Sequence, residues 1–202
     1  MRNTGQAKPR DQESPDRWRP LLRCDRQAFE SFCADVEARL YGYALRMLDG
    51  DASEAEDVAQ EALFRLYEAL EAGRVKRAPK AYVFSIVHNL AQDAVRRNAR
   101  SEAVRRDSVI PSPGGKAPGS AACPVERSML REEIDKALAS LPETQRSALM
   151  LREFGELRYE EIARILGTSI GQVKVNIFRA RKRLAVLLDR DGQYVGKEHH
   201  GA

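Results

Sequence analysis

Apolar residues recur at steps of three and four positions along most of this chain, the period that places side chains on one face of an α-helix. The pattern fills two blocks, residues 26–100 and 126–188, and no stretch shows the two-residue alternation of a strand. We therefore predict an all-α protein. The expected helices span about 29–47, 53–70 and 79–100 in the first block, and about 130–141, 142–154, 159–166 and 170–187 in the second.

Stretches without this period flank and separate the two blocks. Residues 1–25 are polar and rich in Arg and Pro, which predicts a disordered leader. Residues 101–125 contain PSPGGKAPGSAACP, whose Pro, Gly and Ser neither sustain a helix nor fill a core. We therefore expect two small helical domains joined by a flexible linker, with a disordered tail over residues 189–202.

Local signals predict several helix ends. Ser53 with Glu56, and Ser169 with Gln172, fit the spacing of a capping box at a helix start. Gly167 ends the short helix that precedes the last one. A short helix, a glycine turn and a longer helix together predict a helix-turn-helix over the end of the second block.

The last helix has the most clearly defined faces. Its apolar stripe consists of Ile170, Val173, Ile177, Ala180, Leu184 and Leu187. The opposite face presents Gly171, Gln172, Lys174, Val175, Phe178, Arg179 and Lys182. Such side chains can reach base edges, thymine methyls and phosphates in a major groove. A charge run alone more often only solvates a helix, but an outward Phe178 within a helix-turn-helix favours DNA contact.

The helix over 79–100 has a polar, partly aromatic back with basic residues at its end. If Val83, Ile86, Val87, Leu90 and Ala94 point inward, the back carries Tyr82, Ser85, Asn89, Gln92, Asp93, Arg96 and the neighbouring Arg97. Aromatic rings can stack on unpaired bases, and amides can read their edges. Composition alone favours an ordinary polar helix back, and Asp93 opposes nucleic acid.

The helix over 53–70 presents an aromatic residue among acidic ones. Its outward face carries Asp57, Gln60, Glu61, Phe64 and Glu68. This face would repel DNA and could bind a protein. The alternative is that Phe64 folds against the leader or the linker.

Composition narrows the remaining classes of function. The net charge of +4 permits a nucleic-acid partner without establishing one. Cys24, Cys33 and Cys123 lack the paired spacing of a zinc site, and we expect reduced thiols. No nucleophile, His or carboxylate cluster suggests catalysis, so we expect no enzyme, no metal and no cofactor. The absence of a long apolar segment predicts a cytoplasmic protein.

Three stretches resemble the extracytoplasmic function (ECF) family of bacterial sigma factors of the sigma-70 type. They are SEAEDVAQEALFRLYEAL, PKAYVFSIVHNLAQDAVRRNAR and LPETQRSALMLREFGELRYEEIARILGTSIGQVKVNIFRARKRL. The resemblance implies a sigma-2 domain over 26–100 and a sigma-4 domain over 126–188. It implies an alternative sigma factor that binds core RNA polymerase and directs promoter-specific initiation, and an anti-sigma factor as a further partner.

The resemblance also assigns the three surfaces. The face around Phe64 would meet the clamp helices of the largest polymerase subunit. The back of the helix over 79–100, with Tyr82 and Asn89, would meet the melted minus-10 element. The outward face of the last helix would lie in the major groove of the minus-35 element of promoter DNA.

Two other classes of function remain as alternatives. A free-standing helix-turn-helix regulator would bind operators as a dimer, with residues 26–98 as its dimerisation or sensor module. A helical enzyme acting on nucleic acid would need carboxylate or His clusters on a shared face. No such cluster is found.

Overall fold

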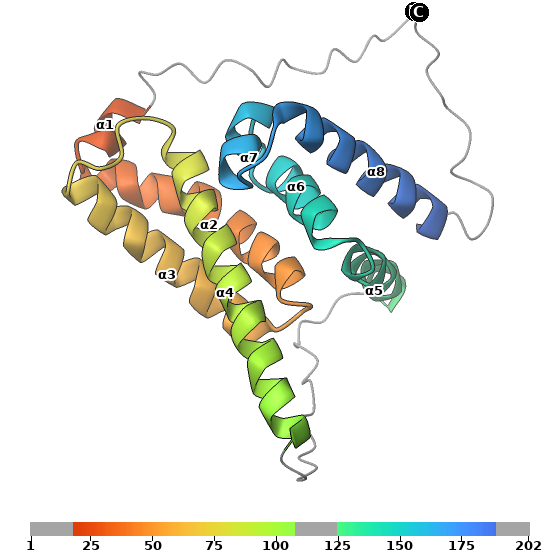
Figure 1. The fold of residues 1–202 in the computed structure, drawn as a ribbon. Coiled ribbons are helices and arrows are strands. Elements are labelled where there is room, and N and C mark those ends of the chain that lie inside the picture. Colours follow the sequence, from red (N-terminus) through yellow and green to blue (C-terminus); the bar gives the residue numbers. More distant parts are fainter. Residues whose placement is uncertain (1–17, 108–124, 189–202) are drawn as a thin grey trace, which may run out of the picture.

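The structure is a computed structural model that describes residues 18–107 and 125–188. Within these ranges every regular element is a helix, which confirms the expected all-α class. Figure 1 shows two groups of helices side by side. They are α1 (Arg19–Leu22), α2 (Arg26–Met47), α3 (Ala52–Glu71) and α4 (Pro79–Asp107), followed by α5 (Val125–Ala139), α6 (Glu143–Glu153), α7 (Tyr159–Ile165) and α8 (Ile170–Leu188).

The first group is a bundle in which α2, α3 and α4 each contact the other two. Its centre is filled by Leu40, Tyr43, Leu66, Val83 and Phe84, all fully buried. Removing apolar side chains from water stabilises such a bundle by roughly 25 cal/mol for each Å² buried. The bundle therefore provides a rigid base for the outward faces of α3 and α4.

The end of the expected leader is ordered. Trp18 and α1 lie against α2, where the Trp18 ring meets Phe32 edge-on with 5.6 Å between ring centroids, and Leu21 is buried. The prediction of disorder over residues 1–25 is therefore wrong for 18–25, because Trp18 and Leu21 supply apolar anchors despite the polar composition around them. Residues 1–17 and the tail 189–202 lie outside the described residues.

Helix α3 begins at a different cap from the expected one. Its N-cap is Asp51, whose side chain accepts a hydrogen bond of 3.0 Å from the backbone N–H of Glu54. Ser53 lies inside the helix and is exposed. The capping box predicted from Ser53 and Glu56 is therefore wrong, since Asp51, two residues earlier, caps the helix instead.

Helix α4 differs from its prediction in length and in its buried face. It continues past residue 100 to Asp107, into the expected linker 101–125. Its buried residues are Pro79, Val83, Phe84, Val87, His88, Ala91 and Ala94, whereas Ile86 and Leu90 are only half-buried. The inward stripe is therefore rotated from the expected one, in a helix that contacts α2, α3 and α7.

The second group contains the predicted helix-turn-helix. Helices α6 and α7 both pack against α8 through a core of Leu151, Ile162, Val173, Ile177 and Ala180. Gly167 has a φ of +61°, which favours glycine and allows the chain to turn sharply after α7. The predicted cap of α8 is formed, since Ser169 Oγ accepts a hydrogen bond of 3.1 Å from the backbone N–H of Gln172.

The apolar stripe of α8 is buried only along its middle. Ile170 at its start and Leu187 near its end are exposed, although the sequence pattern placed both in the core.

The two groups of helices contact each other. Helices α6 and α7 lie beside α2 and α4 (Figure 1), and α5 also contacts α2. The buried Arg146 of α6 forms an ion pair of 2.7 Å with Asp49, which follows α2. The interface is therefore partly ionic, although the buried apolar residues of both groups form one continuous cluster.

Candidate nucleic-acid interface

The outward face of α8 is exposed to solvent. All seven residues predicted to contact DNA are exposed, and together they form the α8 basic face: Gly171, Gln172, Lys174, Val175, Phe178, Arg179 and Lys182. Phe178 is 67% exposed, which is unusual for a phenylalanine with an apolar core beneath the same helix. Basic groups around an exposed ring fit a duplex groove better than they fit plain solvation.

Two supporting residues were not singled out in the sequence. The ring of Tyr159 lies between two cations, with Arg152 at 5.0 Å and Lys174 at 5.8 Å from its centroid. Such contacts hold a long basic side chain in place. The buried Asn176 accepts a hydrogen bond of 3.0 Å from Gln172 Nε2, which orients the amide of Gln172. Their only sequence signal is their position beside the α8 basic face.

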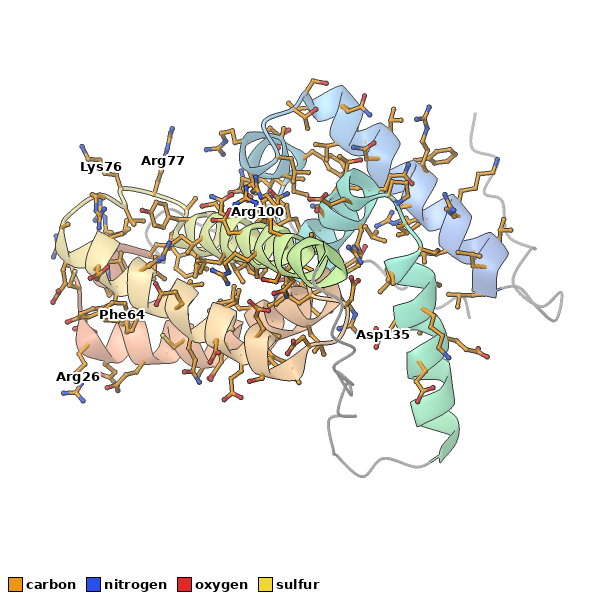
Figure 2. The ribbon with its side chains drawn as sticks, turned by 60° about the horizontal axis from the view of Figure 1, so that its bottom comes forward. Arg26, Phe64, Lys76, Arg77, Arg100 and Asp135 are labelled. Carbon is orange, nitrogen blue, oxygen red and sulfur yellow. The ribbon has the colours of Figure 1, made fainter. Side chains whose placement is uncertain are left out.

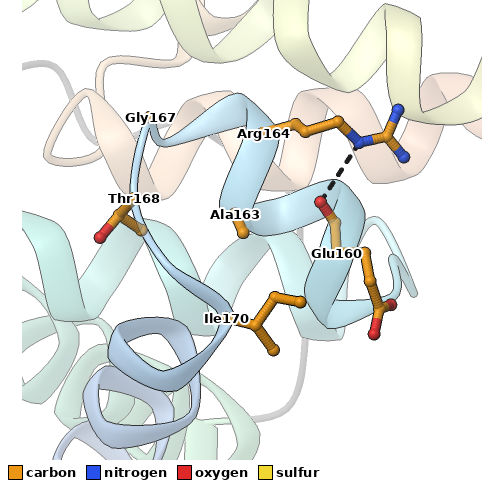
Figure 3. Close-up of a pocket in the computed structure, with 6 residues that line it drawn as sticks. All are labelled: Glu160, Ala163, Arg164, Gly167, Thr168 and Ile170. Atoms are coloured by element: carbon orange, nitrogen blue, oxygen red, sulfur yellow. Dashed lines mark hydrogen bonds between the residues drawn. The ribbon is translucent and has the colours of Figure 1, made fainter.

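A shallow hollow lies at the turn of the helix-turn-helix (Figure 3). Ala163 and Gly167 line it together with Ile170, the first residue of α8. At its rim, Arg164 Nε donates a hydrogen bond of 3.3 Å to the backbone oxygen of Glu160, one turn earlier in α7. The hollow is open to solvent, and Glu160, Arg164 and Thr168 complete its lining.

The second predicted nucleic-acid surface is the α4 polar face, formed by Tyr82, Ser85, Asn89, Arg96 and Arg97. Asn89 and the two arginines are exposed, whereas the others are half-buried. Several of these groups already have partners. Ser85 Oγ donates to the backbone oxygen of Tyr82 at 2.6 Å, and Arg97 donates to Glu54 of α3 at 3.0 Å.

Basic residues extend this surface beyond the prediction. Lys76 and Arg77, in the loop between α3 and α4, are exposed and point away from the bundle (Figure 2). Arg100 lies near the other end of α4 (Figure 2). The α4 polar face therefore has cations at both ends, as a surface that follows a phosphate backbone requires.

The predicted protein-binding surface is the α3 acidic face, formed by Asp57, Gln60, Glu61, Phe64 and Glu68. Phe64 is 58% exposed and lies at the opposite side of the molecule from α8 (Figure 2). This exposure is more than a side chain folded against residues 18–25 would show. Tyr67, one turn further along α3, is also exposed, and its ring meets Phe29 with 5.2 Å between centroids.

A buried polar pair lies between α2 and α4. Tyr43 Oη and His88 Nδ1 share a hydrogen bond of 2.7 Å. Burial, with the positive charge of Arg96 in addition, lowers the pKa of His88 to about 4. His88 is therefore a neutral core residue at ordinary pH and not a general base or a metal ligand.

The described residues give little support for a metal site or a reactive thiol. Among them, no group of three or more His, Cys, Asp or Glu side chains is placed to hold a metal ion. Burial raises the pKa of the Cys33 thiol to about 11, which disfavours the reactive thiolate. No helix within 18–107 or 125–188 is long and apolar enough to cross a membrane.

Comparison with known proteins finds matches to both halves of the chain. Residues 34–101 match the family model of sigma-70 region 2, and residues 131–184 match that of sigma-70, region 4. The chain is 35% identical to the RNA polymerase sigma-H factor of Pseudomonas aeruginosa over 172 residues, covering 81% of this chain and 88% of the relative. It is 29% identical to the ECF RNA polymerase sigma factor SigW of Bacillus subtilis, covering 83% and 92%.

Solved structures show similar folds. The sigma factor RpoE of Bartonella quintana, in complex with the anti-sigma factor NepR, is similar with a TM-score of 0.63 and 27% identity. The match covers 82% of this chain and 99% of that one. CnrH, in complex with the cytosolic domain of CnrY, shares the fold with a TM-score of 0.57 and 24% identity, covering 88% and 99%.

Proposed function

Because this chain belongs to the sigma-70 family of RNA polymerase sigma factors, as an ECF type, we propose that it uses three separate surfaces to initiate transcription. As an alternative sigma factor it binds core RNA polymerase and directs initiation at specific promoters. We also propose that it acts in the cytoplasm, where the polymerase transcribes.

The α8 basic face reads the minus-35 element in the major groove. Gln172 and Lys174 lie near the start of α8, where a recognition helix approaches base edges, and Phe178 is suited to thymine methyls. Arg179 and Lys182 would contact phosphates. The 67% exposure of Phe178 among basic side chains is the observation that carries this assignment.

The α4 polar face engages the minus-10 element. Tyr82 would stack on an unpaired base, Asn89 would read a base edge, and Arg96 and Arg97 would contact the backbone. Unstacking a base costs a few kcal/mol, which these contacts offset. The sigma-2 domain is proposed to cover residues 26–100 and the sigma-4 domain residues 126–188.

The α3 acidic face binds the clamp helices of the largest polymerase subunit. Its carboxylates would repel DNA, whereas an exposed Phe64 offers an apolar anchor for a protein partner. This surface distinguishes a polymerase subunit from a free-standing regulator, which has no need of it.

An anti-sigma factor is a further proposed partner. The structural relatives RpoE and CnrH are each described in complex with another protein, and NepR, the partner of RpoE, is named as an anti-sigma factor. We expect such a protein to compete for the same surfaces.

One experiment tests the proposed function directly. Purified core polymerase transcribes a promoter library with and without this protein, and the transcripts are sequenced. Initiation at a defined set of promoters only when the protein is added is expected. Specific DNA binding that merely blocks transcription by another sigma factor would instead support a regulator.

The variant Phe64→Ala tests the polymerase-binding face. Because Phe64 is exposed, the free energy of unfolding should change by less than about 1 kcal/mol. Loss of an interface anchor should weaken affinity for core polymerase by about tenfold or more. Unchanged affinity in a core-binding titration would remove Phe64 from this surface. Val186→Ala, at an exposed valine of α8, is the matched control.

A further inference from the structure

A carboxylate of the second domain bridges two cations of the first. Glu156, in the turn between α6 and α7, lies 2.6 Å from Arg39 Nη1 of α2 and 2.9 Å from Lys80 Nζ of α4. The Lys80 side chain is only 14% exposed. Burial would raise the pKa of Glu156, but hydrogen bonds from Lys80 and Arg39 outweigh it and lower the pKa to about 2. Glu156 is therefore held as an anion between two positive groups from different helices.

The backbone at Glu156 is also unusual. Its φ is +49°, a left-handed conformation that is unfavourable for a residue with a Cβ. Such a conformation persists only where the surroundings compensate, and the two ion pairs supply that compensation. The turn therefore places this carboxylate against Arg39 and Lys80 of the first domain.

The interface around this contact packs closely. The ring of Phe154 lies so near Gly42 that an added Cβ would come within 2.5 Å of a ring carbon. The guanidinium of Arg46 lies over the same ring, 4.9 Å from its centroid. Glycine is disfavoured in the middle of a helix. The close approach of the Phe154 ring explains why α2 has a glycine at position 42.

Two of the contacts between the domains are made by residues of α4. Lys80 precedes Tyr82 by two positions, and further along α4 Gln92 donates a hydrogen bond of 2.9 Å to Glu143 of α6. Ser85 and Asn89 lie between these two points along α4. Two glutamates of the second domain thus contact α4, one before Tyr82 and one between Asn89 and Arg96.

We infer that Arg39 and Lys80 form a phosphate-binding site for promoter DNA, which the carboxylate of Glu156 occupies while the two domains are in contact. A pair of cations that binds a carboxylate at 2.6 and 2.9 Å can bind a phosphate oxygen in the same way. Closure of the domains and engagement of the DNA strand by this site are therefore mutually exclusive. This inference rests on the proposed role of the α4 polar face.

The first test measures DNA binding by the full chain without polymerase. The probe is a fluorescein-labelled single strand of dT, followed by fluorescence anisotropy at low salt. Glu156→Gln should bind the probe about tenfold more tightly, because it releases two cations. Glu30→Gln is the matched control, since it removes the same charge and releases Arg26 at a distance from this face. Equal affinities for these two variants would overturn the competition by Glu156.

The second test identifies the phosphate site itself. In the Glu156→Gln background, Arg39→Gln and Lys80→Gln should each abolish most of the gain and make the dependence of log affinity on log salt less steep by about 0.7. Arg26→Gln in the same background is the control. If the gain in probe affinity remains when both Arg39 and Lys80 are replaced, these residues do not form the phosphate-binding site.

A third variant opens the interface without changing charge. Gly42→Ala places a methyl group against Phe154 and should increase probe affinity like Glu156→Gln, while circular dichroism confirms that α2 remains helical. No increase would show that closure does not cover the site. None of these measurements uses polymerase, so their failure is distinct from a failure of the transcription assay.

Discussion

Stability should fall as the pH drops below neutrality, because of His88. This side chain is 3% exposed, and its pKa is lowered from 6.5 to about 4, first by burial and then by the charge of Arg96. Between these two values the unfolded chain binds a proton that the folded chain does not. The contribution of His88 to stability is therefore full above about pH 6.5 and is lost as the pH falls towards 4.

The size of the effect follows from the same shift. One pKa unit corresponds to about 1.4 kcal/mol, so the fold should lose about 2 kcal/mol between about pH 7.5 and about pH 5. Urea unfolding followed by circular dichroism measures this difference, and His88→Gln, which cannot titrate, is the reference. We expect the variant to show a pH dependence smaller by about 2 kcal/mol. An identical pH dependence in both proteins would refute the reasoning, since carboxylates contribute equally to the two.

Three further variants test other features. Asp51→Ala should destabilise the protein by about 1 kcal/mol because it removes the cap of α3, whereas Ser53→Ala should change the free energy of unfolding by less than about 0.5 kcal/mol. Trp18→Ala should cost about 1 to 3 kcal/mol in urea unfolding, because the ring packs on the core; a change near zero would show that the segment before α2 is not docked. Phe178→Ala should weaken binding of minus-35 duplex DNA in the polymerase complex about tenfold at unchanged stability, with Val186→Ala as control; equal affinities would remove Phe178 from the DNA surface.

The faces of α8 could be predicted from sequence because one buried stripe determines the opposite side of a regular helix. Val173, Ile177 and Ala180 are buried as expected, and Phe178 is exposed as expected. Only the ends of the stripe were wrong. Burial at the ends of a helix depends on the neighbouring elements. The spacing of residues within one helix carries no information about those elements.

The buried face of α4 was harder to predict for a physical reason. The hydrophobic period along one helix predicts a single buried stripe, but α4 contacts helices of both domains. Phe84 and His88 are consequently buried, while Ile86 and Leu90 are half-buried. A buried histidine carries no periodic signal because its burial depends on a partner, Tyr43, from another helix.

The contact between the domains was not predicted from the sequence. It includes polar and charged residues such as Arg146 and Glu156, which a hydrophobic pattern assigns to the surface. Their pairing depends on how two domains are arranged, and only the three-dimensional structure reveals it. A glycine in the middle of a helix, such as Gly42, was the one local anomaly that could have pointed to a close approach.

The bridge from Glu156 to Lys80 also has a consequence for synthesis on the ribosome. These two residues are 76 positions apart, so Lys80 is made well before its partner exists. At roughly 5–20 residues per second, translation takes about 4 to 15 s to add the missing segment. Helices α2, α3 and α4 make their contacts with each other and can fold in that time. Each new molecule therefore passes through a brief period in which the cations on its first domain are uncovered, before the domains can close for the first time.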